Sequence, residues 1–209
     1  YLERAYSDLL SYYTSGAWYG NNTMVKLLFF GGNETTYMAW DGVSADDLKT
    51  NRRYNPAGQY IDDDGNIAYY DNQTDNYFQQ HLQLHATHTF NTHWDLNAAL
   101  HYTHGGGYYE QYKCDAKFSA YGLENYTDAS GETIKRSDLV RQKHLNNHFY
   151  GGIAAVNYHN NSLQASLGGG MNNYNGSHFG NVIWLRNYPL HVAKDYEYYR
   201  NRGDKFDAN

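Results

Sequence analysis

The chain has 209 residues, a formal net charge of −6 and one cysteine, Cys114. This charge offers no basic surface for nucleic acid, and a single cysteine excludes an internal disulfide framework or a thiolate metal cluster. No apolar run approaches the roughly 18 residues of a membrane helix, while 24 tyrosines, 20 glycines and only 2 prolines favour strands and turns. The sequence begins at Tyr1 without an initiator Met or a signal peptide, so we expect it to be part of a longer polypeptide.

The first predicted hairpin covers about residues 8–30, DLLSYYTSGAWYGNNTMVKLLFF, and turns at Gly20-Asn21-Asn22. Its second half contains VKLLFF, which is apolar at consecutive positions. The pattern therefore predicts two strands but leaves open which of their faces is apolar.

The second predicted hairpin covers about residues 78–104 and has a tight connection at Asn91-Thr92. Apolar and polar residues alternate along both strands, which is typical of a sheet whose two faces meet different surroundings. The apolar positions are Phe78, Leu82, Leu84, Ala86 and Phe90, followed after the turn by Trp94, Leu96, Ala98, Leu100 and Tyr102.

The third predicted hairpin covers about residues 148–172 and turns at Asn160-Asn161. A seventh strand is expected to begin near Lys205, after the six strands of the three hairpins. One face of the third hairpin carries Tyr150, Gly152, Ala154, Val156 and Tyr158, then Leu163, Ala165, Leu167, Gly169 and Met171.

Long polar connections alternate with these tight turns and cover about residues 31–76, 105–147 and 173–204. Loops beyond about 15 residues are uncommon in compact soluble domains, whereas outer-membrane barrels combine short periplasmic turns with long extracellular loops. Within the second connection, residues 109–122 and 138–145 are compatible with short helices. The chain is therefore predicted to be all-β: an antiparallel transmembrane β-barrel segment of about six strands.

Aromatic residues occur at the ends of the apolar faces. Trp94 and Tyr102 lie eight residues apart in one strand, as Tyr150 and Tyr158 do in another. Eight residues of strand span about 27 Å, or roughly 20 Å of height at a tilt near 40°, which approaches the apolar band of about 25 Å between the aromatic girdles of a barrel. We therefore predict that this face contacts lipid, with a girdle made of Phe78, Phe90, Trp94, Tyr102, Tyr150 and Tyr158.

Four stretches of the chain resemble the barrel region of TonB-dependent outer-membrane receptors of the Bacteroidetes type. They are GGNETTYMAWDGVSADDLKTNRRYNPAGQYIDDDGNIAYYDNQTDNYFQQHLQLHATHTF (31–90), ALHYTHGGGYYEQYK (99–113), SDLVRQKHLNNHFYGG (137–152) and SLGGGMNNYNGSHFGNVIW (166–184). The resemblance implies a barrel of about 22 strands closed by an N-terminal plug domain, in the outer membrane of a Gram-negative cell.

The resemblance also implies a function and partners. Receptors of this family import scarce nutrients such as siderophore-iron, haem, cobalamin or glycans. A TonB complex of the inner membrane supplies the energy through a segment ahead of the plug, and in the glycan-importing branch a surface lipoprotein caps the barrel. The plug, that segment and the remaining strands are expected to lie outside this sequence.

The eleven histidines raise the question of a metal or haem site. His81, His85 and His101 fall on the predicted lumen face, but positions i and i+4 of a strand are about 13 Å apart, too far to share one metal. We therefore predict hydrogen bonding in the lumen and no bound metal or cofactor. Three further histidines lie at the bases of the long connections, and a role as haem ligands stays open for them: His144, His148 and His178.

The segment DDDGN at 62–66 resembles a calcium loop only superficially. Its glycine comes too early for the EF-hand pattern, and no bidentate glutamate closes the loop at the twelfth position. A tight Asp-Gly turn in a β-ribbon is expected instead.

Aromatic and arginine side chains of the long connections are the predicted ligand-binding residues. Tyrosine offers a rigid contact surface with a hydroxyl, and arginine can clamp a carboxylate or phosphate. The alternative is that these connections fold on their own aromatic core. The candidates are Trp40, Arg52, Arg53, Tyr54, Tyr69, Tyr70, Tyr108 and Tyr109.

Two other classes of function compete with a transport receptor. The abundance of tyrosine, tryptophan and asparagine also suits a soluble β-rich carbohydrate-binding module, and a passive porin would fit the strands but less well the long connections. No nucleophile motif and no glycine-rich phosphate loop occurs in the required context, so we predict no enzymatic activity.

Overall fold

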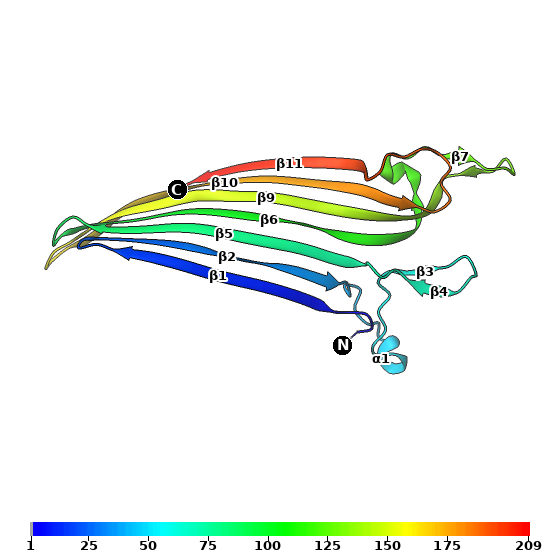
Figure 1. Ribbon diagram of the computed structural model, residues 1–209, viewed down its shortest axis with the longest axis horizontal. Helices are drawn as coiled ribbons and strands as arrows, with labels where there is room; N and C mark the ends of the chain where they lie inside the picture. The colour runs from blue at the N-terminus through cyan, green and yellow to red at the C-terminus, as the bar shows by residue number, and fades with distance from the viewer. Residues whose placement is uncertain (1) are drawn as a thin grey trace.

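A computed structural model describes residues 2–209, and most of them belong to one antiparallel sheet (Figure 1). Its seven strands follow one another in chain order: β1 (Ser7–Tyr19), β2 (Thr23–Tyr37), β5 (Thr74–Thr89), β6 (Trp94–Lys117), β9 (Arg136–His159), β10 (Gln164–Leu185) and β11 (Tyr196–Ala208). The predicted all-β, antiparallel fold class is confirmed. Among the described residues the sheet is open, with β1 and β11 as its edges.

The short elements lie outside this sheet, within the long connections. They are the hairpin β3 (Gln59–Ile61) with β4 (Ile67–Tyr69), the hairpin β7 (Tyr126–Thr127) with β8 (Thr133–Ile134), the helix α1 (Asp47–Thr50) and the 3₁₀ turn η1 (Phe118–Tyr121). Within residues 2–209, no helix has the length and apolar character needed to cross a membrane.

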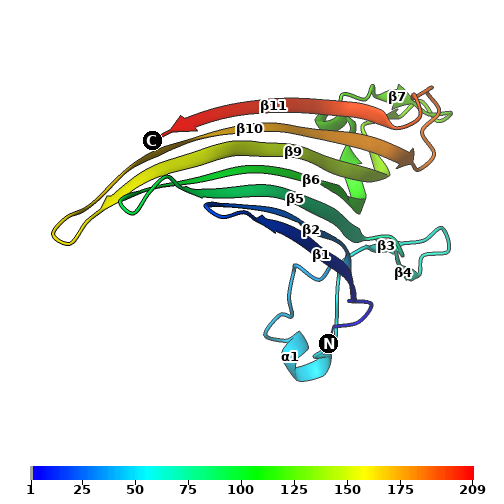
Figure 2. The same ribbon diagram turned by 60° about the vertical axis from the view of Figure 1, so that its left-hand side comes forward.

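The two ends of the sheet differ in their connections. Tight turns at 20–22, 90–93 and 160–163 gather at one end, and the connections 38–73, 118–135 and 186–195 gather at the other (Figures 1 and 2). Asparagine side chains close two of the turns: Asn91 Oδ1 accepts a hydrogen bond from the amide of His93 at 2.8 Å, and Asn160 Oδ1 accepts one from Leu163 at 2.8 Å. Such Asx turns explain why asparagine occupies these positions.

The strands extend further into the connections than the sequence pattern predicted. Residues 109–113 and 138–145 belong to β6 and β9, so the predicted helices over 109–122 and 138–145 are wrong apart from the short η1. The seventh strand begins at Tyr196 rather than near Lys205. Cross-strand pairing overrides local composition here, because β6 and β9 stay in register from Trp94↔Tyr158 to Lys113↔Leu139.

Glycines allow β6 to continue through a segment that looks like a loop. Gly105 and Gly106 lie opposite Gln79 and Phe78 of β5. A Cβ atom at Gly105 would lie 2.5 Å from the Tyr77 hydroxyl, and one at Gly106 would lie 2.8 Å from the Phe78 ring. The glycines therefore make room for aromatic rings of the neighbouring strand, which is a packing role rather than a sign of a turn.

The register gives the sheet one apolar and one polar face. The row Ala86–Ala98–Ala154–Gly169 crosses four strands on the apolar face. The same register also shows which side chains of the first hairpin lie on the apolar face, a question that the sequence pattern left open. The apolar face carries Val25, Leu27, Phe29, Leu82, Leu84, Leu96, Leu100, Val156, Leu167 and Met171. The polar face carries Lys26, Gln79, His81, Gln83, His85, Asn97, His101, Thr103, Asn157 and Asn172, together with the apolar Leu9, Leu28, Phe30 and Ile153.

Large apolar side chains are exposed on the apolar face. Leu100 is 60% exposed, Leu167 is 82% exposed and Met171 is 60% exposed, whereas His81 and His101 on the polar face are half-buried. The polar face also exposes Leu9 and Ile153, at 67% and 60%. In a water-soluble sheet the leucines of the apolar face would be covered.

Among residues 2–209, the buried hydrophobic residues lie at the end of the sheet that bears the long connections. Ala116, Tyr121, Leu139 and Val182 form one buried cluster, against which Tyr198 packs. Because Tyr121 comes from η1, this cluster anchors the connection 118–135 on the strands.

Replacement of Leu139 by alanine is expected to loosen this anchor. The side chain is fully buried, so its truncation should lower the local stability by about 2–5 kcal/mol. The measurement is the rate of limited proteolysis within 118–135 in the parent polypeptide. Leu167→Ala, at an exposed site on the adjacent strand, is the matched control, and equal cleavage of both variants would contradict the assignment.

Candidate functional site

Aromatic side chains flank the apolar face at two levels. At the end with the tight turns, Trp94 is the direct cross-strand partner of Tyr158, and the ring centroids are 4.8 Å apart. Further along the same strands Tyr102 is paired with Tyr150. The register also places Phe29 and Phe206 in the row of Tyr102, two aromatic residues that the sequence pattern did not single out.

The two remaining residues of the predicted girdle lie further apart. Phe90 follows the end of β5 within the tight turn, where its ring lies 4.7 Å from the ring of His88. Phe78 lies near the other end of β5, and its ring meets that of His104 edge-on at 5.0 Å. Both belong to the apolar face or its margin.

The three histidines predicted to face the lumen each have a polar neighbour. His81 Nδ1 lies 2.9 Å from the Thr103 hydroxyl, and His101 Nε2 lies 2.9 Å from Asn172 Oδ1. His85 Nε2 lies 3.1 Å from Gln83 Oε1 on its own strand. In the part of the chain that the structure describes, no group of three or more His, Cys, Asp or Glu residues is suited to hold a metal ion.

The structure separates the histidines at the bases of the connections. His148 stacks on His104 with centroids 4.5 Å apart, and His144 stacks on Phe179 at 4.6 Å, both on the side of the apolar face. His178 lies on the polar face, in the row of Leu145. These three residues therefore do not converge on one ligand position.

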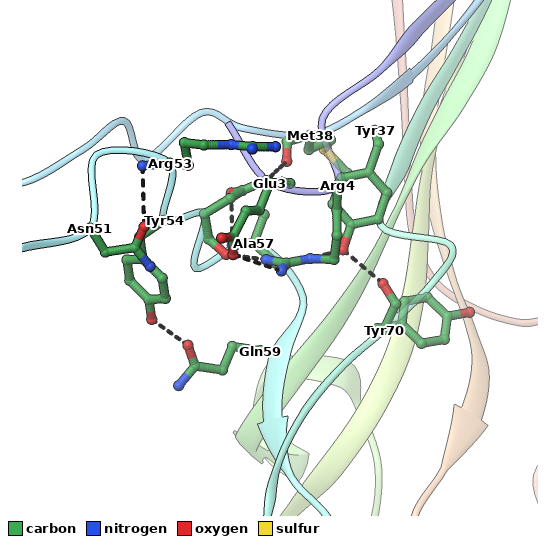
Figure 3. A network of polar contacts seen from close by, with 11 residues as sticks. Glu3, Arg4, Tyr37, Met38, Asn51, Arg53, Tyr54, Ala57, Gln59 and Tyr70 are labelled. Carbon is green, nitrogen blue, oxygen red and sulfur yellow. Dashed lines mark hydrogen bonds and ion pairs between the residues drawn. The ribbon is translucent and has the colours of Figure 1, made fainter. Parts of the chain in front are cut away.

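A network of polar contacts holds the first connection together near Arg4 and Tyr54 (Figure 3). The Arg4 guanidinium lies 3.6 Å from the centre of the Tyr69 ring. Asn55 is buried, and its Nδ2 donates to the carbonyl oxygens of Glu3 and Met38, both at 3.0 Å. Tyr54 donates a hydrogen bond to Gln59 Oε1 (Figure 3). Tyr54 and Tyr69 thus have partners within the folded first connection and in Arg4.

Arg52 and Arg53 are exposed at the outer surface of this connection. The main chain of Arg53 forms the contacts: its amide donates to Asn51 Oδ1 at 3.3 Å, and its carbonyl accepts from the Glu3 amide at 2.7 Å. The nearby DDDGN segment is the turn between β3 and β4, where Asp62 Oδ1 accepts from the amide of Asn66 at 2.8 Å, as the Asp-Gly turn predicts.

Glu110 of β6 links the first connection to the sheet through hydrogen bonds. Its buried carboxylate accepts hydrogen bonds from the Tyr70 hydroxyl, from Asn72 Nδ2 at 2.8 Å and from Gln142 Nε2 at 2.6 Å. Burial, together with the hydrogen bond to Glu110, raises the pKa of Tyr70 above its usual range, so this phenol stays protonated and acts as a donor. Tyr70 therefore has a structural role in the first connection.

Trp40 and Tyr109 are the predicted binding residues that the structure brings together on the polar face. Their rings meet edge-on with centroids 5.4 Å apart, while Tyr108 points to the other face and contacts His144 at 5.1 Å. Two hollows of about 310 and 340 Å³ adjoin here and share Asp75 and Tyr77. We call them the trough; its polar and aromatic lining includes Glu34, Trp40, Asp75, Tyr77, Tyr109, Lys143, His178 and Tyr199.

Sequence reasoning missed Asp75, Tyr77, Lys143 and Tyr199 as members of this site. Asp75, Lys143 and Tyr199 belong to the ends of three different strands, which were assigned to the connections, and Tyr77 lies between the first predicted connection and the second predicted hairpin. The alternation of side chains along the strand was the available signal. Tyr77 precedes His81 by an even number of residues, so both side chains are on the polar face.

A scan against protein-family models and a search of curated proteins gave no match. Among solved structures, the chain is similar to the ferric-catecholate import receptor Fiu from E. coli K12. Its open form shows 10% identity and a TM-score of 0.39, covering 99% of this chain and 44% of the receptor. Its closed form shows 11% identity and a TM-score of 0.38, covering 99% and 41%. The chain spans less than half of these receptors.

Replacement of Glu110 by alanine should release the first connection from the strands. The Tyr70 hydroxyl, Asn72 and Gln142 would lose their shared acceptor, at a cost of about 1–3 kcal/mol. Hydrogen exchange of the amides around Tyr70 should accelerate in the parent polypeptide. Glu132→Ala, at an exposed site in the second connection, provides the control, and unchanged exchange in Glu110→Ala would refute the anchoring role.

Proposed function

We propose that this chain is an arc of a transport receptor in the outer membrane of a Gram-negative bacterium, of the TonB-dependent type. The observation that carries the proposal is the exposed apolar face of the sheet, flanked by aromatic residues, opposite a polar face. Lipid would cover Leu100, Leu167 and Met171, and the polar face would line the lumen.

The edges of the sheet fit this assignment. β1 and β11 each present 13 residues along an edge to which no further described strand pairs. A sheet in lipid must close so that its backbone groups are satisfied, hence we expect additional strands of the parent polypeptide to pair with both edges.

The proposed receptor takes up a scarce nutrient: siderophore-iron, haem, cobalamin or a glycan. The long connections then lie outside the cell and the trough faces the incoming ligand. The TonB complex acts through a plug region elsewhere in the parent polypeptide, and the bilayer and a surface lipoprotein are further partners. In this role the chain binds and passes its ligand without chemical reaction.

Cell fractionation tests this location. The parent polypeptide should be found in the outer membrane and should migrate differently on a gel before and after boiling in detergent, because closed barrels resist detergent until heated. A water-soluble parent without a heat-dependent shift would favour the carbohydrate-binding alternative instead.

Ala98 and Ala99 offer a matched pair on opposite faces of β6. Ala98 lies in the middle of the apolar face between Ala86 and Ala154, whereas Ala99 lies between His85 and Ile153 on the polar face. Ala98→Arg should place a charge near the middle of the bilayer, cost about 2–4 kcal/mol and reduce the amount of heat-modifiable barrel. Ala99→Arg should retain it. Equal loss in both variants, or no loss in either, would overturn the assignment of the faces.

A further inference from the structure

The trough contains charged side chains of both signs that lack ion-pair partners. Lys143 forms no ion pair with any carboxylate in residues 2–209, and its Nζ lies 5.9 and 6.0 Å from the ring centroids of Tyr109 and Tyr199. Asp75 likewise pairs with no cation among these residues. Such charges beside aromatic surfaces are suited to oppositely charged groups of a ligand.

A second carboxylate accompanies Asp75. Glu34 lines the same trough and accepts hydrogen bonds from the hydroxyls of Ser7 at 3.1 Å and Thr36 at 2.9 Å, but it too pairs with no described cation. The negative end of the trough therefore carries two carboxylates, and the positive end carries Lys143.

The register fixes the spacing of these two ends. Asp75 is the direct partner of Tyr109, and Tyr109 is the direct partner of Lys143, so the three residues form one row across β5, β6 and β9. Neighbouring strands lie about 4.8 Å apart, which places the two charged residues about 10 Å apart with the Tyr109 ring between them. Trp40 packs on the edge of that ring.

A ligand that satisfies this row carries a cation and an anion about 10 Å apart, with an uncharged portion between them. Three residues of extended peptide span about 10 Å between their termini. A simple anion would satisfy Lys143 but would be repelled by Asp75 and Glu34, and a neutral sugar would neutralise neither end.

We propose that the trough binds a short peptide of about three residues with free termini. The terminal ammonium lies at Asp75 and Glu34, the terminal carboxylate lies at Lys143, and the central side chain contacts Tyr109 and Trp40. This inference goes beyond the proposed receptor function, because a short peptide is not among the nutrients named there and the site itself does not require a membrane.

The test compares three peptides on the parent polypeptide purified in detergent: Ala-Leu-Ala, its N-acetylated form and its C-amidated form. Each blocked peptide should bind about tenfold more weakly than the free one, because each lacks one charge-assisted contact. Dissociation constants follow from saturation-transfer NMR titrations.

Two variants assign the termini. In Lys143→Gln the free and the amidated peptide should bind alike while acetylation still weakens binding. In the double variant Glu34→Gln/Asp75→Asn, which removes both carboxylates, acetylation should lose its effect while amidation keeps its own. Lys26→Gln, on the polar face near the tight turns, is the control and should bind all three peptides like the unchanged protein.

Equal binding of the three peptides, or no binding of any, would overturn the peptide site. The heat-dependent gel shift of the same preparation keeps the two proposals separate. If the parent polypeptide is in the outer membrane and shows the gel shift but binds all three peptides equally, only the peptide site is rejected. If the parent polypeptide is water-soluble but binds the blocked peptides more weakly than the free one, the peptide site stands and the receptor function is rejected.

Discussion

The antiparallel register from β1 to β11 is the constraint on which the rest of this structure depends, and its shifts, at Lys113/Ala116, Gly180/Asn181 and Val182/Trp184, occur only near the end with the long connections. Successive side chains of a strand point to opposite faces, so a fixed register assigns every residue of seven strands to one face. A slip of one residue between β6 and β9 would move Ala98 and Leu100 to the polar side and His101 to the apolar side. The chemical difference between the faces and the hydrogen-bonded ladder therefore support each other.

The two ends of the sheet are held by different interactions. At the tight turns, asparagine side chains close short loops and no large core is required. At the other end the connections carry the buried residues, and Leu139, Tyr121 and Glu110 fasten them to the strands through apolar contact and hydrogen bonds. The middle of the sheet has neither a second layer nor a core within the described residues, which leaves its apolar face available to lipid.

The trough shows how a polar site arises on such a scaffold. Asp75, Tyr109 and Lys143 lie far apart in the sequence and meet only because three strands pair in one register. Regular strands hold their spacing, since the distance between paired strands hardly varies. The first connection adds Trp40 to this row, so regular strands and a folded connection together shape the trough.

The sequence by itself determined the local features: the tight turns, the alternation in 78–104 and 148–172, and the separation of His81 and His85 along a strand. These depend on neighbouring residues alone, because the period of a strand and the conformation of an Asx turn are local properties. Only the tertiary structure decided the facing of the first hairpin and the extension of β6 and β9 through the predicted helices. It also decided which of the candidate residues meet in the trough. Those outcomes depend on which strand pairs with which and at what register, and pairing between distant segments leaves no periodic signal in either segment.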